Sequence, residues 1–195
     1  MSSAASFAAQ VARIPVAELD GPGLGQWDLR ALVGHASRSL VTVDTYLEQP
    51  ADEVVVGSAA EYYLAIAGAL GAGDAAIVER GVAAGAALGG DPAAYVEDLR
   101  ARVAEKLTSY DDSYLLTTIA GGMRLDEYLR TRTFELVVHG LDIAVASGVD
   151  PTFADGPLVD AGTLAAEVAA LSGHGASLLL ALTGRRSLPS GFSVV

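Results

Sequence analysis

The segment from Asp126 to Ala146 constrains the fold more than any other part of the sequence. Projected as a helix at about 100° per residue, its polar side chains fall on one narrow face and its apolar side chains occupy nearly all of the rest. A helix with so little polar surface is packed inside a protein. We therefore expect it to be buried, with its polar face toward a solvent strip or an internal polar cleft. That face carries Tyr128, Arg132, Glu135, His139 and Asp142.

Helical spacing and capping residues predict helices over most of the remaining chain. Asp28 is the expected N-cap of a helix that reaches Leu47, and Asp91 followed by Pro92 starts another that reaches Ser109. No hairpin signal is found, although LLTTI at 115–119 fits a short extended piece. We expect an all-α protein with a single domain over residues 1–195, a four-helix bundle with additional short helices. The other expected helices lie at 3–11, 53–70, 74–88 (capped by Asp74), 158–171 and 177–183.

The composition and charge exclude several classes of function. The chain has 24 acidic and 12 basic side chains, which gives a formal charge of −12. An acidic surface repels phosphate backbones, and Arg185 and Arg186 form only an isolated basic pair, so we expect no nucleic-acid partner. Abundant alanine and glycine favour close packing of helices and are compatible with a homodimer.

The absence of cysteine and of long apolar segments further limits the possible kinds of site and the expected location of the protein. Without cysteine there is no disulfide, no protein thiol nucleophile and no Cys-ligated zinc. The N-terminal segment lacks a basic region followed by a long apolar core, and the apolar run at 177–184 is too short to cross a bilayer. We therefore expect a cytoplasmic protein that does not enter a membrane.

Glu135 and His139 are spaced to bind one metal ion from a single helix. Side chains four residues apart on a helix have Cβ atoms about 5–6 Å apart and can converge on one ion. Asp142 can then accept a hydrogen bond from the second ring nitrogen of a ligating histidine. The same spacing also suits an ordinary surface pair, with Arg132 as a salt-bridge partner of Glu135. A third convergent ligand would distinguish the two interpretations.

The other two histidines are the candidates for that third ligand. His35 lies on the helix at 28–47, about 110° from the centre of its apolar stripe, where it can face a neighbouring helix or be solvated. His174 lies between two glycines, where we expect a loop role. Two histidines and one glutamate would leave positions on the ion for water or substrate, as in catalytic sites. Zinc fits these ligands best, and nickel, iron and manganese also fit.

Two segments taken together resemble a known family. GLGQWDLRALVGHASRSL and MRLDEYLRTRTFELVVHGLDIAVASG are similar to the two signatures of the metal-binding N-terminal domain of mycothiol-dependent maleylpyruvate isomerases, which belongs to the DinB-like helical bundles. The tail LLLALTGRRSLPSGFSV is similar to the ends of single-domain relatives. The resemblance implies a divalent ion, usually zinc, bound by His35, Glu135 and His139.

The resemblance also implies a reaction. In these isomerases mycothiol works at the metal, adds to an unsaturated diacid, lets a bond rotate and leaves. A metal suits this role because it lowers the pKa of a bound thiol. The isomerases carry a further C-terminal domain that contributes to the active site, whereas we expect this chain to end with the bundle. Maleylpyruvate is a dianion, and Arg132 is the only basic residue on the polar face, so maleylpyruvate itself is not favoured.

We therefore expect a metal-dependent isomerase or S-transferase that uses mycothiol or a similar thiol on a small electrophile. In this enzyme Arg132 would hold a carboxylate of the substrate and Asp142 would orient a ligand. Trp27, just before the helix cap at Asp28, is expected to be a packing anchor. The alternative is a non-catalytic bundle that binds a ligand or a partner, because a fold does not by itself specify a function.

Overall fold

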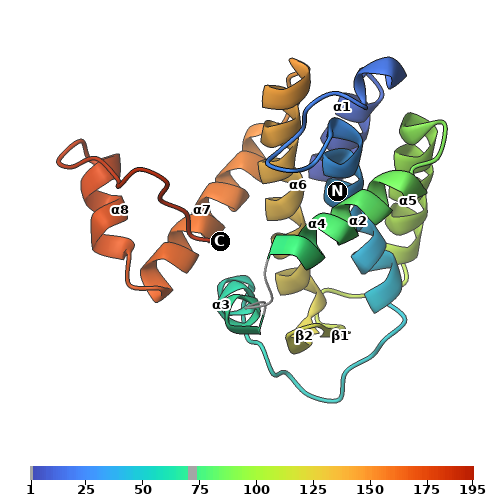
Figure 1. Cartoon of the computed structure of the whole chain (residues 1–195). Helices are drawn as coiled ribbons and strands as arrows, with labels where there is room; N and C mark the ends of the chain where they lie inside the picture. Colours follow the sequence, from blue (N-terminus) through green and yellow to red (C-terminus); the bar gives the residue numbers. More distant parts are fainter. Residues whose placement is uncertain (1, 70–73) are drawn as a thin grey trace.

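The computed structural model describes residues 2–69 and 74–195 (Figure 1). It is all-α, as expected, apart from one two-stranded hairpin. The helices α1, α2 and α5 to α8 match the predicted segments to within three residues at each end. Along the chain the elements are α1 (Ser2–Val11), a 3₁₀ turn (Val16–Glu18), α2 (Leu29–Tyr46), α3 (Ala59–Ala69), α4 (Asp74–Ala87), α5 (Pro92–Leu107), β1 (Leu115–Thr118), β2 (Gly121–Arg124), α6 (Leu125–Ser147), α7 (Asp155–Leu171) and α8 (Gly175–Leu182).

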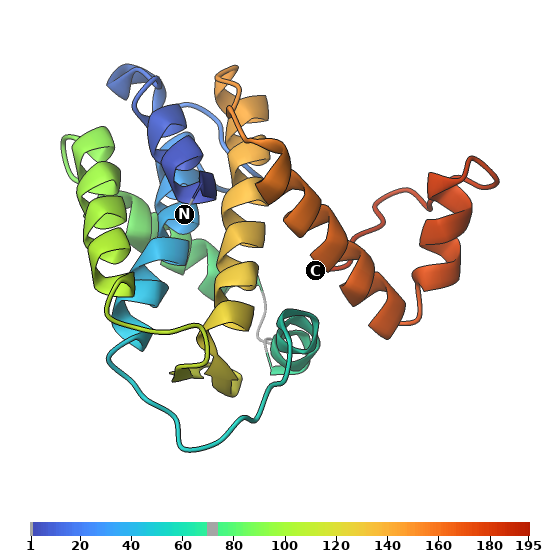
Figure 2. The same ribbon diagram turned by 180° about the vertical axis from the view of Figure 1, so that it is seen from behind.

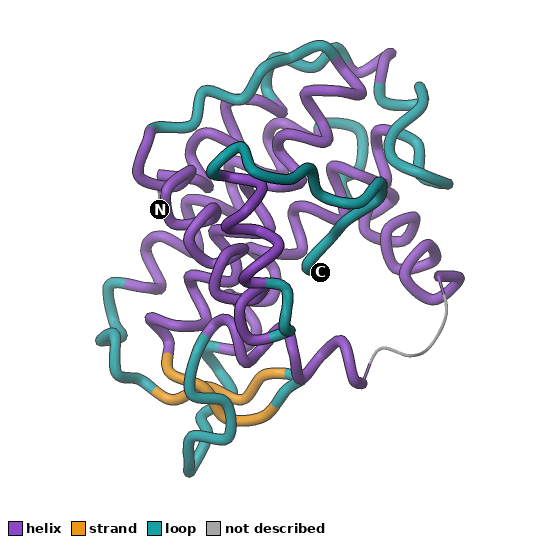
Figure 3. Tube along the Cα trace, turned by 90° about the vertical axis from the view of Figure 1, so that its left-hand side faces the viewer, coloured by secondary structure: helices purple, strands orange, loops and turns teal. Residues whose placement is uncertain are grey.

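Helices α1, α2, α5 and α6 form a four-helix bundle. α1 and α2 each pack against both α5 and α6, so the four helices surround one core (Figures 1 and 2). α4 crosses the outer side of α2, while α3 and α7 pack on each other and on α6. α8 packs on α7 and forms with it an arm that extends away from the bundle in Figures 1 and 2. Figure 3 views the molecule from the side of this arm. In the described ranges no helix is both long and apolar enough to span a bilayer.

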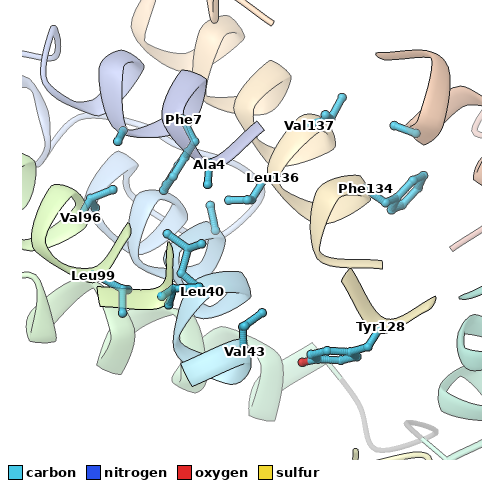
Figure 4. Packing of buried hydrophobic residues seen from close by; sticks show 14 of the residues in the cluster. Ala4, Phe7, Leu40, Val43, Val96, Leu99, Tyr128, Phe134, Leu136 and Val137 are labelled. Carbon is cyan, nitrogen blue, oxygen red and sulfur yellow. The ribbon is translucent and has the colours of Figure 1, made fainter. Parts of the chain in front are cut away.

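The core of the bundle holds α2 and α6 at a fixed separation. Phe7 of α1, Leu32 of α2 and Val96 of α5 are wholly shielded from solvent. Burying one such side chain contributes about 1.5–3 kcal/mol, so the shared core accounts for much of the stability of the bundle. Figure 4 shows its side chains pointing into the space between the four helices, among them Ala4, Phe7, Leu40, Val96, Leu99 and Leu136.

Aspartate side chains begin two of these helices as the sequence predicts, and a glycine ends α6. The carboxylate of Asp28 accepts a hydrogen bond from the amide three residues later at 2.7 Å, and that of Asp91 does the same at 3.0 Å. α6 ends at Gly148, which takes the left-handed conformation with φ of 70°. α4 begins at the expected residue, but the predicted cap by the Asp74 side chain lies outside the described part of the chain.

The predicted start of the third helix at residue 53 is wrong, because α3 begins only at Ala59. Ser58 is the capping residue: its hydroxyl oxygen accepts a hydrogen bond from the amide of Glu61 at 3.2 Å. The carboxylate of Glu61 in turn accepts from the amide of Gly57 at 2.9 Å. This arrangement is a variant of the capping box, in which the glutamate accepts from the amide before the cap residue, and the sequence carries the Ser-Ala-Ala-Glu pattern for it. The predicted end of this helix at residue 70 lies outside the described residues.

The hairpin of β1 and β2 also differs from the prediction, which found no hairpin signal. Its turn lacks the usual Asn-Gly or Asp-Gly pair. The Thr118 hydroxyl instead closes the turn by donating to the carbonyl of Gly121 at 2.8 Å, and Gly121 has a φ of 108°. The amides of Val55 and Val56 donate to the carbonyl of Gly122, which keeps residues 54–56 extended beside β2. The extended piece predicted at 115–119 is confirmed as β1.

Candidate functional site

The polar face of α6 carries a row of three hydrogen-bonded side chains. The Oε2 atom of Glu135 lies 3.2 Å from Nε2 of His139, one helical turn further on. The other ring nitrogen of His139, Nδ1, lies 3.0 Å from Oδ2 of Asp142. Both nitrogens of the imidazole therefore face a carboxylate, and the predicted contact between Asp142 and His139 is confirmed. The row is partly shielded, since the side chain of His139 is only 15% exposed.

His35 of α2 lies directly beside this row. The centres of the His35 and His139 rings are 4.9 Å apart, and the ring planes are nearly perpendicular at 83°. The Nδ1 atom of His35 is buried and has no hydrogen-bond partner in the described part of the chain. The fold thus brings together the three residues predicted as metal ligands, although about a hundred positions separate His35 from the other two.

Trp27 packs on His35 and connects it to α4. The two ring centres are 4.5 Å apart, and the indole Nε1 donates to the carbonyl of Val78 at 3.0 Å. Gly81 makes this contact possible, since a Cβ atom there would lie 2.4 Å from the indole ring. Trp27 is therefore a packing anchor, as predicted.

A pair of glycines, Gly34 and Gly85, allows α2 and α4 to touch through their backbones. A Cβ atom added to Gly34 would lie only 2.2 Å from the amide nitrogen of Gly85. No side chain fits in that space, so α4 lies against α2 one residue before His35. The helix that carries His35 is thus held between the bundle core and α4.

The charges of the row follow from its hydrogen bonds. Burial by itself would lower the pKa of His139, but hydrogen bonds to Asp142 and Glu135 outweigh burial and raise this pKa from 6.5 to about 9. Burial would raise the pKa of Glu135, yet the hydrogen bond with His139 and the charge of Arg132 lower it to about 2. Near neutral pH the row therefore consists of an imidazolium between two carboxylates.

The charge state of His35 is opposite to that of His139. Burial disfavours its charged form, and the positive charge of His139 disfavours it further, so the pKa of His35 falls to about 4. Its imidazole is neutral at neutral pH and keeps a free lone pair. A neutral imidazole is the form that binds metal ions.

Tyr63 of α3 is a member of the site that the sequence analysis missed. Its hydroxyl donates to Oε1 of Glu135 at 2.7 Å and lies 3.2 Å from the carbonyl oxygen of Thr131. Burial and the nearby charge of Glu135 raise the pKa of the phenol, so Tyr63 stays protonated and remains a donor. Its contact with Glu135 crosses between two helices, and no spacing within the sequence indicates it.

Arg132 occupies an aromatic environment beside the row. Its guanidinium lies 4.9 Å from the ring centre of Tyr128 and 5.5 Å from that of Tyr62, and its Nε donates to the hydroxyl of Thr131 at 2.9 Å. Within the described residues no salt bridge joins Arg132 to Glu135 or to any other carboxylate. Arg132 is therefore a partly buried cation that acts on Glu135 only through its charge.

The remaining histidine lies elsewhere. His174 directly precedes α8 on the arm, is exposed and packs edge-on against Phe192, with ring centres 5.5 Å apart, in agreement with the predicted loop role. Across residues 2–69 and 74–195, no three His, Asp or Glu side chains have the arrangement of a preformed metal cluster. Glu135 and His139 are instead hydrogen-bonded to each other.

Comparison with known proteins agrees with the two signatures in the sequence. Residues 1–144 match the family described as the mycothiol maleylpyruvate isomerase N-terminal domain. The chain belongs to this family. The matched range contains His35, Glu135, His139 and Asp142, whereas α7 and α8 lie beyond it. No curated protein and no solved structure matches the chain.

Proposed function

We propose that this chain is a metal-dependent enzyme that uses a low-molecular-weight thiol, mycothiol or a close analogue, as an isomerase or S-transferase on a small electrophile. Membership of the mycothiol maleylpyruvate isomerase N-terminal domain family supports the thiol and the isomerase-like class. The observation that carries the proposal is the meeting of His35 with Glu135 and His139 between α2 and α6. These three residues are the proposed ligands of the metal ion.

The residues present fit a divalent ion. A buried nitrogen without a partner, such as Nδ1 of His35, costs free energy that an ion in contact with the ring would recover. Two imidazoles on one tetrahedral zinc ion, with Zn–N distances of about 2.0–2.1 Å, have ring centres roughly 5 Å apart. The observed separation of 4.9 Å agrees with that geometry. Zinc is the first choice, and nickel, iron and manganese accept the same ligands.

Neighbouring side chains hold the proposed ligands in orientations that suit metal binding. Asp142 accepts from Nδ1 of His139, which fixes the ring orientation and leaves Nε2 toward the proposed site. Tyr63 holds Oε1 of Glu135, which leaves Oε2 next to the same nitrogen. A divalent ion bound here would lower the pKa of a coordinated thiol, as it does for water. Asp142 and Tyr63 are positioning residues in this proposal.

Arg132 is the proposed anchor for an acidic group of the substrate. No carboxylate of the described chain pairs with it, and the rings of Tyr62 and Tyr128 shield it from water. A guanidinium in such surroundings binds a carboxylate more strongly than an exposed one. The substrate would therefore carry at least one acidic group close to its electrophilic carbon.

Metal content tests the first part of the proposal. Protein purified without a nickel column is expected to contain about one divalent ion per chain by elemental analysis. His35→Ala and His139→Ala should each abolish this content, while the control His174→Ala should leave it unchanged. Metal-free wild-type protein whose melting temperature does not respond to added zinc would overturn the metal site.

A thiol-dependent assay tests the second part. Loaded protein is incubated with mycothiol and a series of small unsaturated acids, and loss of the electrophile or of free thiol is followed. We expect turnover that requires both the thiol and the metal. Arg132→Gln should slow this turnover without removing the metal. Inertness with mycothiol, glutathione and bacillithiol in protein that does hold metal would instead support a non-catalytic binding module.

A further inference from the structure

α4 crosses α2 next to α5 (Figure 1). A groove outside the proposed metal site is lined by residues of these three helices. It encloses about 280 Å³. Its lining combines aliphatic side chains, one aromatic ring, a serine and two arginines. The residues that matter here are Arg38 and Val41 of α2, Arg80, Ala83 and Ala87 of α4, and Tyr95 of α5.

The two arginines of this groove are unusual within an acidic protein. Most of the 12 basic side chains form salt bridges, or donate to backbone carbonyls, or stack on aromatic rings. Arg38 and Arg80 have neither a hydrogen bond nor an ion pair with any residue that the structure describes. No acidic side chain lines the groove. Arg38 of α2 and Arg80 of α4 thus line one groove without a partner among the described residues.

This combination selects a particular kind of ligand. Guanidinium groups bind carboxylates and phosphates through paired N–H donors, and the binding is stronger where water is partly excluded. The alanine, valine and tyrosine surface between them favours an apolar body rather than a bare inorganic ion. Gly34, the residue before His35 on α2, also lines the groove, so the groove lies next to the proposed metal site.

We propose that this groove, the anion groove, binds a small organic anion. Its acidic group would contact Arg38 and Arg80, and its apolar body would cover Val41, the alanines of α4 and the ring of Tyr95. The inference stands without the metal. It extends the proposed function in one respect, because a substrate or thiol that carries a second acidic group would find an anchor on the α4 side of His35.

Binding of benzoate to the full-length chain tests the proposal. Benzoate, the neutral benzamide and inorganic sulfate are each titrated into the protein and followed by two-dimensional ¹H–¹⁵N NMR, including the side-chain Nε–H signals of the arginines. We expect benzoate to shift the signals of Arg38 and Arg80 and to bind at least about tenfold more tightly than either comparison compound. Sulfate binding as tight as benzoate, or shifts spread over other arginines, would overturn the proposal.

Variants locate the site and separate it from the metal. Arg38→Gln and Arg80→Gln should each weaken benzoate binding by about tenfold, since each removes a charged donor. Arg186→Gln removes the same charge from the tail and should leave the affinity unchanged. His35→Ala should abolish metal binding but not benzoate binding, so either proposal can fail without the other. Unchanged benzoate affinity in both groove variants would refute the anion groove.

Discussion

Zinc binding at the proposed site should release protons, and the pKa values of the ligands set how many. His139 has a pKa of about 9, so it is protonated at neutral pH and must lose a proton before Nε2 can bind zinc. His35, with a pKa of about 4, is already neutral, and Glu135, with a pKa of about 2, is already ionised. Between pH 5 and 8, therefore, about one proton leaves for each zinc ion bound.

The release of one proton sets how steeply the zinc affinity should change with pH. The zinc affinity should rise by about tenfold per pH unit from pH 5 to 8, and the rise should level off above pH 9, where His139 is already neutral. Asp142→Asn removes one of the two carboxylates that raise the pKa of His139. The pKa of His139 should then move down toward its ordinary value of 6.5, and proton release at pH 8 should fall from about one toward zero.

Isothermal titration calorimetry provides the measurement. Zinc is titrated at pH 8 in two buffers with different ionisation enthalpies, which gives the number of protons released, and competition with a chelator at pH 6, 7 and 8 gives the affinity. Asp160→Asn is the matched control, because it makes the same charge change at an exposed position of another helix, α7. Wild-type zinc binding that releases no proton at pH 7 would refute the reasoning, as would an Asp142→Asn variant with unaltered proton release.

Three further predictions concern single contacts of the site and of the fold around it. Tyr63→Phe removes the 2.7 Å hydrogen bond to Glu135 and should weaken zinc binding by about tenfold in the same competition assay, with little change in fold by circular dichroism. Gly34→Ala places a Cβ atom against the α4 backbone and should lower the free energy of unfolding by about 2–3 kcal/mol in urea titrations. Gly162→Ala, in open space on α7, should instead raise it by about 0.5–1 kcal/mol, and equal effects of the two changes would contradict the close helix contact. Ser58→Ala should cost about 1 kcal/mol through loss of the α3 cap, and no change in stability would argue against that cap.

Most helices could be predicted because their signals are local. The caps at Asp28 and Asp91 depend on side chains that bond to amides three residues away, and the structure has both bonds. The hairpin could not be predicted in the same way, because its turn lacks the usual residue pair and the hydrogen bonds to the carbonyl of Gly122 come from residues more than sixty positions earlier. The late start of α3 does have a local signal, the Ser-Ala-Ala-Glu segment at 58–61, which the predicted start at residue 53 overlooked.

The site shows the same division between local and long-range information. The approach of Glu135, His139 and Asp142 follows from helical spacing alone, and the sequence predicts it. The position of His35 depends on how α2 packs against α6 and α4, which no periodicity within one helix reveals; the family resemblance indicated it instead. Tyr63 belongs to the site only because α3 packs on α6, so nothing in its own segment marked it.

The stacking of Trp27 on His35 has a practical consequence for the study of this protein. The chain contains one tryptophan, and its ring centre lies 4.5 Å from the imidazole. Light that tyrosine does not absorb therefore excites a single indole at the edge of the proposed site. Protonation of that imidazole, or an ion arriving on it, alters the surroundings of the indole directly. The molecule thus carries its own optical probe, so metal loading and release can be followed in real time without a label.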